Sequence, residues 1–427
     1  MAARAFPNRL DLGDEALAIA RTLHDAGFEV WCVGGAVRDA LLGAAPSGTA
    51  ARAERIDAEH AGAGAAEVDF TTSATPEEVQ ALFRRTVPVG LKHGTIGVLD
   101  RQRVLHEVTT FRRDVETDGR HAVVAYGVSL EEDLARRDFT INAIAYHPLR
   151  HEWRDPFGGA ADLAAGVIRA VGRPAERFRE DYLRILRALR FAARFEFRIE
   201  PATWDAARAA APGLERLSAE RVRDEWFKGL RTARSVARLV QLWLESGAAQ
   251  RWLPELAYAR PPGGDYASTE VDREPRDPVL LTAFLCDDPA AVLERLRASR
   301  AEIARAEAIA RGPAEPGGGA EAVRRWLAVV GAAPGGAADD LTAIWRLRHR
   351  SEAPWATTVA EIRARGDAVI RGQLAIDGRD VQALGIPPGP RIGAVLDRLL
   401  DRVLADPSLN TRERLTELAR TIAAAPE

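Results

Sequence analysis

Residues 133–143 read DLARRDFTINA and form the most informative stretch of the chain. It combines two acids, two guanidinium groups and an amide with residues typical of buried structure, which indicates a polar site on a rigid frame. Within it, Asp138 accepts hydrogen bonds, Arg137 donates them and Asn142 does both, so the three suit ribose and phosphate groups. The spacing from Asp138 to Asn142 predicts one helical turn with both side chains on one face. The alternative is that Asp138 only caps a helix over 139–146.

Two acids alternate in a predicted strand earlier in the chain. Glu67 and Asp69 lie two positions apart, so both side chains are expected on the same face of the sheet. Mg²⁺ prefers few carboxylates combined with phosphate oxygens and water, and this pair offers that set. Glu107 ends another predicted strand and is a candidate third acid. Two Mg²⁺ ions held by three acids would activate a hydroxyl and stabilise a pyrophosphate leaving group, whereas the alternative is a solvated strand face.

A glycine pair, Gly34-Gly35, stands between a predicted strand and a predicted helix. Without Cβ atoms, the backbone amides at such a turn can approach phosphates closely. The pair matches neither the dinucleotide-binding fingerprint nor the phosphate-binding loop of nucleoside triphosphatases, and a simple tight turn is the alternative. Arg38 and Asp39 open the next helix, where an ion pair between them is the simplest interpretation.

A second polar motif, EDYLR at residues 180–184, begins a strongly helical stretch. Asp181 and Arg184 are three residues apart, so a surface ion pair is the default interpretation. A carboxylate and a guanidinium side by side also present acceptors and donors in one plane, as reading the edge of a nucleobase requires. Arg187 and Arg190 follow on the same stretch and suit either a surface that faces phosphates or a solvated helix face.

The bulk composition sets the class of protein. With 427 residues, 47% of them hydrophobic and 28% charged, the chain is expected to be a soluble globular protein of two to four domains. A net charge of −3 excludes a polycation, so any nucleic-acid surface has to be a local patch. The two cysteines are far apart, which favours a reducing cytoplasm over a disulfide. The sequence shows no signal peptide and no apolar run of about 20 residues, so we expect no membrane span.

Local patterns predict an N-terminal domain of strands and helices that ends near residue 150. Its expected helices cover 14–27 and 36–42, and a third begins at Pro76 with a capping box formed by Thr75 and Glu78. Its expected strands cover 29–33, 68–70, 96–99 and 104–108. Beyond residue 155 helical periodicity dominates to the end, with breaks at Gly- and Pro-rich segments. Residues 44–66 are rich in Ala and Gly, and we interpret them as a surface insertion.

Together these motifs resemble one family. The matching segments follow the family's order over residues 30–200: VGGAVRD (33–39), LLG (41–43), EVDFTT (67–72), HGT (93–95), EVTTFR (107–112), DGRH (118–121), the stretch at 133–143, EDYLR (180–184) and RALRF (187–191). The chain is similar to the class II tRNA nucleotidyltransferases, which are the bacterial CCA-adding enzymes, and to their relatives the bacterial poly(A) polymerases. A weaker match, LGIPPGP at 384–390 with NTRE at 410–413, favours the CCA-adding enzymes.

The resemblance implies an α+β nucleotidyltransferase head with a small mixed sheet over 1–150 and all-α parts after it: a neck with base recognition over 151–235, a body over 236–330 and a tRNA-binding tail over 331–427. It implies catalysis by Glu67, Asp69 and Glu107, with Glu67 and Asp69 as the ligands of Mg²⁺. The residues implied to bind the nucleotide are Gly34, Gly35, Arg38, Arg120, Arg137, Asp138, Asn142, Asp181, Arg184, Arg187 and Arg190. Among these, Asp181 and Arg184 would read the base.

The implied reaction is template-independent transfer of CMP and AMP from CTP and ATP to the 3′ end of tRNA, with release of pyrophosphate. The alternatives are a poly(A) polymerase and a partial enzyme that adds only CC or only A. A non-enzymatic RNA-binding module would need loss of the acids, which are retained. Glu67 departs from the family pattern, which usually has Asp there, and we still expect metal binding. The insertion at 44–66 is a second departure, and the sequence leaves the oligomeric state open.

Overall fold

The structure is a computed structural model, and it describes residues 6–43, 67–91, 94–117, 122–256, 276–333 and 335–424. The predicted insertion at 44–66 therefore lies outside the described residues. The chain divides into two compact units, residues 1–254 and 255–427. The finer division into head, neck, body and tail stays a prediction.

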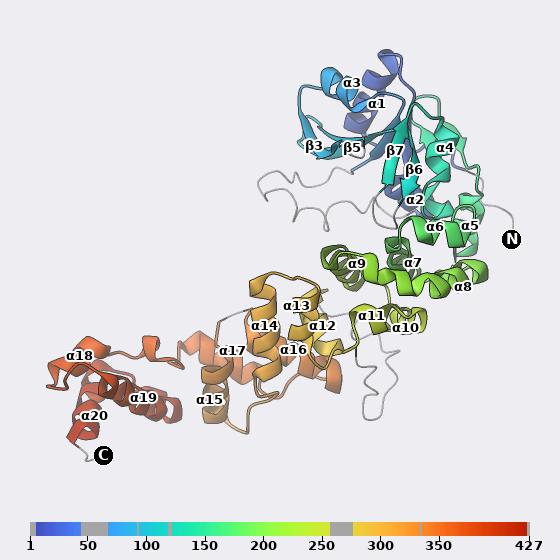
Figure 1. Ribbon diagram of the computed structural model, residues 1–427. Helices are drawn as coiled ribbons and strands as arrows, with labels where there is room; N and C mark the ends of the chain where they lie inside the picture. The colour runs from blue at the N-terminus through green and yellow to red at the C-terminus, as the bar shows by residue number, and fades with distance from the viewer. Residues whose placement is uncertain are drawn as a thin grey trace. The chain divides into compact units, whose positions relative to one another are not determined.

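The first unit is built on a seven-stranded sheet with the strand order β3-β4-β5-β2-β1-β8-β9. Figure 1 labels two of its strands, β3 and β5, and the helices α1 and α3. The strands are β1 (Val30–Val33), β2 (Asp69–Thr72), β3 (Thr86–Gly90), β4 (Thr95–Leu99), β5 (Leu105–Thr110), β8 (Ala145–His147) and β9 (Glu152–Arg154). Only the pair β2 and β5 is parallel, and the other neighbours are antiparallel. The predicted mixed sheet is thus confirmed, and it has more strands than the four that the sequence suggested.

One face of this sheet is covered by helices. Helix α1 (Asp14–Asp25) packs against β1, and α3 (Pro76–Leu82) packs against β4 and β5. On β5, His106, Val108 and Thr110 are buried, and the Thr110 hydroxyl donates to the carbonyl of Ala74, just before α3. The alternate positions of β5 are half-buried and belong to the opposite face of the sheet. That opposite face is where the candidate site lies.

The segment after α4 (Leu130–Ala135) differs from the prediction. Instead of a helix over 139–146, it forms a single 3₁₀ turn, η3 (Thr140–Asn142), and then enters β8. Ala145 is paired with Val33 in the middle of the sheet, so this part of the chain has to be extended. Pairing with a central strand overrides the local helical pattern.

Helices dominate the remainder of the first unit, as expected. Two short strand pairs accompany them: the hairpin β6 (Arg112–Thr117) with β7 (Ala122–Tyr126), and β10 (Val167–Ile168) with β11 (Arg198–Ile199). The helices are α2 (Gly35–Leu42), α5 (Gly159–Ala165), α6 (Pro174–Glu180), α7 (Leu183–Phe195), α8 (Pro201–Ala210), η4 (Ala211–Arg216), α9 (Ala219–Thr232), α10 (Val236–Ser246) and α11 (Ala248–Trp252). Helix α7 is central, because it packs against both α9 and α10.

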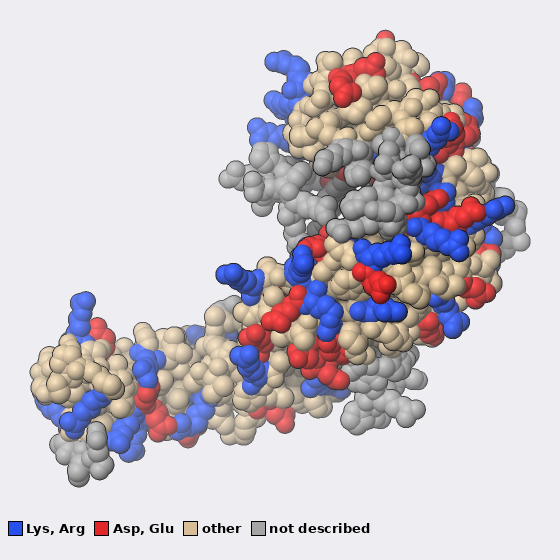
Figure 2. All heavy atoms as spheres, in the orientation of Figure 1, with Lys and Arg blue, Asp and Glu red and all other residues tan. Residues whose placement is uncertain are grey.

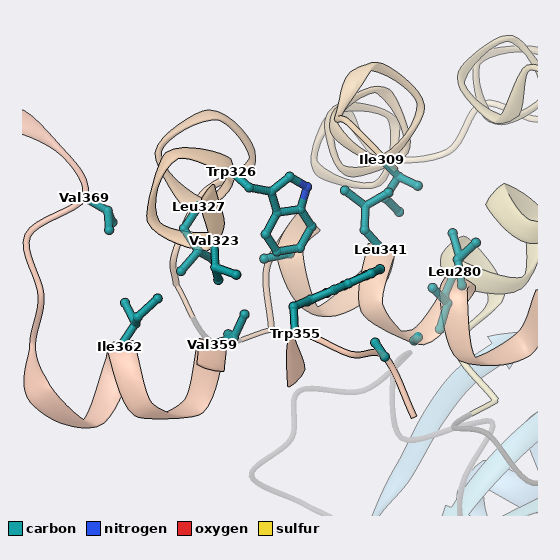
Figure 3. Packing of buried hydrophobic residues seen from close by; sticks show 14 of the residues in the cluster. Leu280, Ile309, Val323, Trp326, Leu327, Leu341, Trp355, Val359, Ile362 and Val369 are labelled. Atoms are coloured by element: carbon teal, nitrogen blue, oxygen red, sulfur yellow. The ribbon is translucent and has the colours of Figure 1, made fainter. Parts of the chain in front are cut away.

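The regular elements described in the second unit are helices, and an isolated β-bridge joins Leu256 to Cys286. Its helices are α12 (Pro278–Leu285), α13 (Pro289–Arg295), α14 (Arg300–Arg311), α15 (Ala320–Val330), α16 (Ala337–His349), α17 (Ala356–Arg365), η5 (Arg371–Gln373), α18 (Gly378–Ala383), α19 (Pro390–Ala405), η6 (Pro407–Leu409) and α20 (Arg412–Ala424). Trp326 and Trp355 lie in one hydrophobic core, with ring centroids 6.0 Å apart and aliphatic residues around them (Figure 3). A smaller core around Leu399 and Leu415 holds α19 and α20 together. Within the described ranges, no helix is long and apolar enough to cross a membrane.

Several local predictions are confirmed in detail. Helix α3 begins with Pro76, and both hydrogen bonds of the capping box between Thr75 and Glu78 are present. The predicted turn after residue 99 joins β4 to β5 as an antiparallel pair.

On the face of the molecule drawn in Figure 2, acidic and basic side chains are interspersed over the helical parts of the chain.

Candidate active site

The two predicted acids flank a buried residue at the start of β2. Val68 is 1% exposed, whereas Glu67 and Asp69 are half-buried, as alternation along an extended chain requires. Phe70 of β2 is paired in parallel with Val108 of the neighbouring strand β5. Asp69 and Glu107 therefore each stand one position before that pair. Parallel strands in register point equivalent side chains to the same face, so these carboxylates share the face opposite α1 and α3, where Asp133 of α4 also accepts from Thr71. We call Glu67, Asp69 and Glu107 the acidic face.

The glycine turn lies against this face. Gly34 has φ +71°, which glycine adopts without strain, and it ends β1 directly before α2. A Cβ on Gly34 would lie 3.7 Å from Asp69 Oδ2 and 3.6 Å from Arg137 Nη1. The turn, a carboxylate and a guanidinium therefore converge on one small volume, although they come from three separate segments.

A buried acid that the sequence analysis did not select holds this guanidinium. Asp133 is fully buried and accepts hydrogen bonds from Arg136 Nε at 3.1 Å, Arg137 Nη2 at 3.2 Å and the Thr71 hydroxyl at 3.2 Å. Burial opposes its ionisation, but Arg137 and Arg136 lower the pKa of Asp133 below its usual value. The carboxylate thus stays charged and orients Arg137 toward Gly34. The sequence signal for this role is that Asp133 stands three and four residues before Arg136 and Arg137, within residues 133–143.

Three predicted ligand residues bind one another inside the protein. Arg38 is 4% exposed, and its Nη1 donates to Asn142 Oδ1 at 2.7 Å. Asn142 Nδ2 in turn donates to Asp138 Oδ1 at 2.9 Å, so the two side chains meet as predicted although the segment is not an α-helix. The simple ion pair between Arg38 and Asp39 is also present, at 2.7 Å. Burial lowers the pKa of Arg38 to about 10.

Helix α7 continues this chain of contacts. Arg187 Nε donates to Asp138 Oδ2 at 2.7 Å, and Arg190 Nε donates to Glu225 Oε2 at 2.6 Å. Burial opposes the ionisation of Asp138, but Arg187 and Asn142 lower its pKa to about 2. Glu225 on α9 is 4% exposed, and it was not predicted. We call the following set the buried ion network: Arg38, Asp39, Asp138, Asn142, Arg187, Arg190 and Glu225.

The predicted ion pair between Asp181 and Arg184 is not formed. Asp181 Oδ2 accepts from Arg221 Nη2 at 2.7 Å, and Asp181 Oδ1 accepts from the backbone of Leu183. Arg184 instead donates to Glu180 Oε2 at 2.6 Å. The reason is the break between α6 and α7, because Asp181 is in an extended conformation there and does not lie on the same helix as Arg184.

The same helix break brings the motif at residues 180–184 next to residues 133–143. Arg184 Nη2 donates to the carbonyl of Arg136 at 2.9 Å, and Arg177 Nη1 donates to the carbonyl of Ala135 at 3.1 Å. Burial opposes the charge of Arg187, but Asp138 and Glu225, with a smaller effect of Asp181, raise its pKa above the usual value. Residues near 181 and residues near 138 therefore border one region of the first unit.

Two predictions remain outside these contacts. Arg120 lies outside the described residues. Among the residues that the structure describes, no three His, Cys, Asp or Glu side chains are grouped so as to hold a metal ion. A site built on Glu67 and Asp69 would therefore depend on oxygens from the substrate and water to complete the coordination.

Comparison with known proteins identifies the family. A model of the poly A polymerase head domain matches residues 30–169, and a model described as a probable RNA and SrmB-binding site of polymerase A matches residues 196–260. The Bacillus stearothermophilus CCA-adding enzyme, solved in complex with CTP, is 31% identical with a TM-score of 0.75, over 96% of this chain and 97% of that one. This chain belongs to the family of CCA-adding enzymes and poly(A) polymerases.

Further members of the family are similar over part or all of the chain. A CCA-adding enzyme of Streptococcus suis is 41% identical over 254 residues, which are 57% of this chain and 55% of that protein. That of Leuconostoc mesenteroides is 45% identical over 218 residues, or 50% of this chain and 49% of that protein. The matched stretches thus span about half the length of these relatives. A Thermotoga maritima CCA-adding enzyme complexed with tRNA shares the fold at 21% identity, with a TM-score of 0.61 and 97% coverage of both chains. The predicted nucleotidyltransferase family is confirmed.

Proposed function

We propose that this protein transfers CMP and AMP from CTP and ATP to the 3′ end of tRNA without a nucleic-acid template and releases pyrophosphate. The observation that carries the proposal is the convergence of the Gly34 turn, the Asp69 carboxylate and the Arg137 guanidinium. A glycine turn admits a phosphate close to the backbone, a guanidinium neutralises it, and a carboxylate binds a cation beside it. Similarity to a CCA-adding enzyme in complex with CTP supports this assignment over the whole chain.

A divalent cation fits the donor set of the acidic face. The donors are carboxylate oxygens, which Mg²⁺ prefers, and Asp69 Oδ2 faces the space that the missing Cβ of Gly34 leaves open. Glu67 and Asp69 would hold Mg²⁺, and Glu107 would add negative charge from the neighbouring strand. When bound, Mg²⁺ would supply charge neutralisation for the triphosphate and for the oxygens that enter and leave.

The reaction is a displacement at the α-phosphorus of the nucleotide. The terminal ribose hydroxyl of tRNA forms the new P–O bond and gives up its proton, and the bond to the pyrophosphate oxygen breaks. The chain supplies position and electrostatics, with no covalent intermediate on the protein. Gly34 and Gly35 border the triphosphate, and Arg137 donates to its oxygens from the place that Asp133 fixes.

The ribose and base are assigned to the helical side of the site. Asp138 and Asn142 would contact the ribose, with Arg38 and Arg187 holding them in place, and Arg190 is proposed to support them from its ion pair with Glu225. Asp181 and Arg184 would read the base. Their contacts with Arg221 and Glu180 would then have to be shared or exchanged when a nucleotide binds, because each base edge needs the same donors and acceptors.

The test is incorporation of labelled nucleotides into tRNA that lacks its 3′ terminus. We expect two CMP and one AMP per tRNA when Mg²⁺, CTP and ATP are all present. Absence of any incorporation with folded protein would refute the proposal.

The poly A polymerase description of the head model favours a second candidate, extension of RNA with ATP alone. Product lengths separate the candidates. A run of AMP without CTP identifies a poly(A) polymerase, and products that stop at CC or require a CC end identify a partial enzyme.

A further inference from the structure

A buried histidine lies directly behind the acidic face. His106 is 1% exposed and is on β5, on the face of the sheet that the helices cover. Its Nδ1 accepts a hydrogen bond from the backbone N–H of Val68 at 3.1 Å. Val68 is the residue between Glu67 and Asp69, so this bond fixes the backbone that carries both acids.

The histidine is held in turn by a buried acid. His106 Nε2 lies 3.3 Å from Asp100 Oδ2, and the side chains are 2% and 1% exposed. Asp100 Oδ1 accepts from the backbone of Val104 at 2.7 Å, which anchors the carboxylate in the turn between β4 and β5. This turn also contains Arg103, at φ +65°.

These contacts define which ring nitrogen carries the proton. An N–H donor faces Nδ1, so Nδ1 has to be the unprotonated acceptor. The proton is then on Nε2, which donates it to Asp100. A carboxylate behind a histidine commonly selects the tautomer in this way.

The ladder between β2 and β5 explains why such a contact matters. Backbone pairing of these parallel strands covers Phe70 to Thr72 and does not extend to Val68. The imidazole therefore takes the N–H of Val68 where the ladder has ended. Without an acceptor there, this buried N–H would lose its partner and the segment from 67 to 69 would lose its anchor.

We propose that His106, oriented by Asp100, is a positioning residue that fixes the Glu67–Asp69 segment for binding of a divalent cation. The inference rests on the proposed function of the acidic face and goes beyond it, because neither residue touches the substrate. It also accounts for how Glu67, one methylene longer than Asp, is kept in register with Asp69: the backbone between them is fixed.

Two substitutions separate the two contacts of the ring. In His106→Asn, the side-chain oxygen takes the place of Nδ1, so an acceptor for Val68 is retained and the contact with Asp100 is lost. In His106→Gln, the amide reaches the place of Nε2, so the contact with Asp100 is retained and the acceptor for Val68 is lost. Thr110→Val is the matched control, because Thr110 is equally buried on the same face of β5 and bonds to Ala74 instead.

The measurement is Mn²⁺ binding in the presence of CTP, read from the electron paramagnetic resonance signal of the free ion. We expect the dissociation constant to rise about tenfold in His106→Gln and to stay near wild type in His106→Asn and Thr110→Val, since residues behind metal ligands typically change affinity by factors of about 10–100. A wild-type affinity in folded His106→Gln, or equal losses in both His106 variants, would overturn the proposal.

A spectroscopic readout covers the case in which a His106 variant does not fold. The ¹⁵N chemical shifts of His106 in the wild-type protein should show an unprotonated Nδ1 and a protonated Nε2, and the opposite pattern would overturn the proposal. Asp100→Asn turns the partner of Nε2 into a donor, so it should disturb that pattern and weaken Mn²⁺ binding. If the wild-type protein binds Mn²⁺ with this dependence on His106 but incorporates no nucleotide, the proposed function fails while the inference stands.

Discussion

The acidic face and the buried ion network contain motif residues of equal prominence in the sequence, yet the structure treats them differently. Glu67, Asp69 and Glu107 remain half-buried, and Asp69 lies beside the glycine turn. Arg38 and Asp138 are less than 10% exposed, and Asn142 joins them, because it accepts a hydrogen bond from Arg38 and donates one to Asp138. Charged residues that recur in a functional motif therefore differ in their surroundings: some lie at a half-buried face, and others are bound within a network of internal hydrogen bonds.

The largest effect on activity is expected when a residue of the acidic face is removed. Asp69→Ala should reduce nucleotide incorporation by about 10²–10³-fold, as loss of a single charge-stabilising group typically does. The unfolding free energy should change little, because Asp69 is half-buried and lies at the start of its strand. Asp25→Ala, at an exposed position on the covered side of the sheet, is the control and should retain full activity. Unchanged incorporation by Asp69→Ala would contradict the assignment.

The buried ion network should respond in the opposite way. Asp138→Ala removes a partner of Arg187 and Asn142 and leaves the Arg187 guanidinium with the more distant Glu225, at 3.9 Å. We expect the unfolding free energy to fall by about 3–5 kcal/mol, measured by urea denaturation. Asp205→Ala, on the exposed surface of α8, should change it by less than about 0.5 kcal/mol. Full stability of Asp138→Ala would contradict this structural role, and a loss of activity at full stability would leave only the proposed ribose contact for Asp138.

The same residue predicts an acid-dependent stability. The pKa of Asp138 is lowered to about 2 in the folded protein from 3.8, so the folded state favours its ionised form. Its contribution is complete above about pH 5 and is lost as the pH falls through about 4 to 2, with a size of roughly 2 kcal/mol. Asp138→Asn cannot titrate, so the stability gap between wild type and this variant should shrink by that amount between pH 5 and pH 2. A gap independent of pH would show that Asp138 is not held ionised by Arg187.

Packing behind the base-reading motif offers a smaller effect. A Cβ on Gly213 would lie 2.0 Å from the ring of Tyr182, which follows Asp181 in the chain. Gly213→Ala should displace that ring and lower the unfolding free energy by about 1–2 kcal/mol. Gly318→Ala, where no atom lies near the added Cβ, is the control. The Michaelis constants for CTP and ATP should rise in Gly213→Ala and not in Gly318→Ala. Equal Michaelis constants in the two variants would mean that Tyr182 does not contribute to base recognition.

The smallest expected effect concerns the partner of Asp181. The ion pair between Arg221 and Asp181 is about one-third exposed on either side, so it contributes less than about 1 kcal/mol to stability. Arg221→Ala should therefore fold normally and change the preference between CTP and ATP by a few-fold, measured by competition. Arg173→Ala, which removes a largely exposed pair with Glu176, should leave the preference unchanged. If Arg221→Ala and Arg173→Ala show the same preference between CTP and ATP, Arg221 does not influence Asp181 during base selection.

Much of this arrangement follows from the sequence because it depends on local rules. The capping box at Thr75, the alternation around Val68 and the glycine turn at Gly34 each use only neighbouring residues. The meeting of Asp138 with Asn142 was predicted from their spacing, although the helix assumed for it was wrong.

The remainder depends on contacts between distant segments. The segment after Asn142 is extended because β1 lies beside it, and Glu225 binds Arg190 from another helix, 35 residues away in the sequence. Likewise, Asp181 takes Arg221 as its partner because α6 and α7 are separate helices. Periodicity within one element carries no information on such partners.

The most direct test of the account is a crystal soaked with Mn²⁺ and a non-hydrolysable CTP analogue. The account predicts an anomalous peak bound by oxygens of Glu67 and Asp69, next to the triphosphate at the Gly34 turn. A peak bound by Asp138 instead, or carboxylates at 67 and 69 directed away from each other, would contradict it.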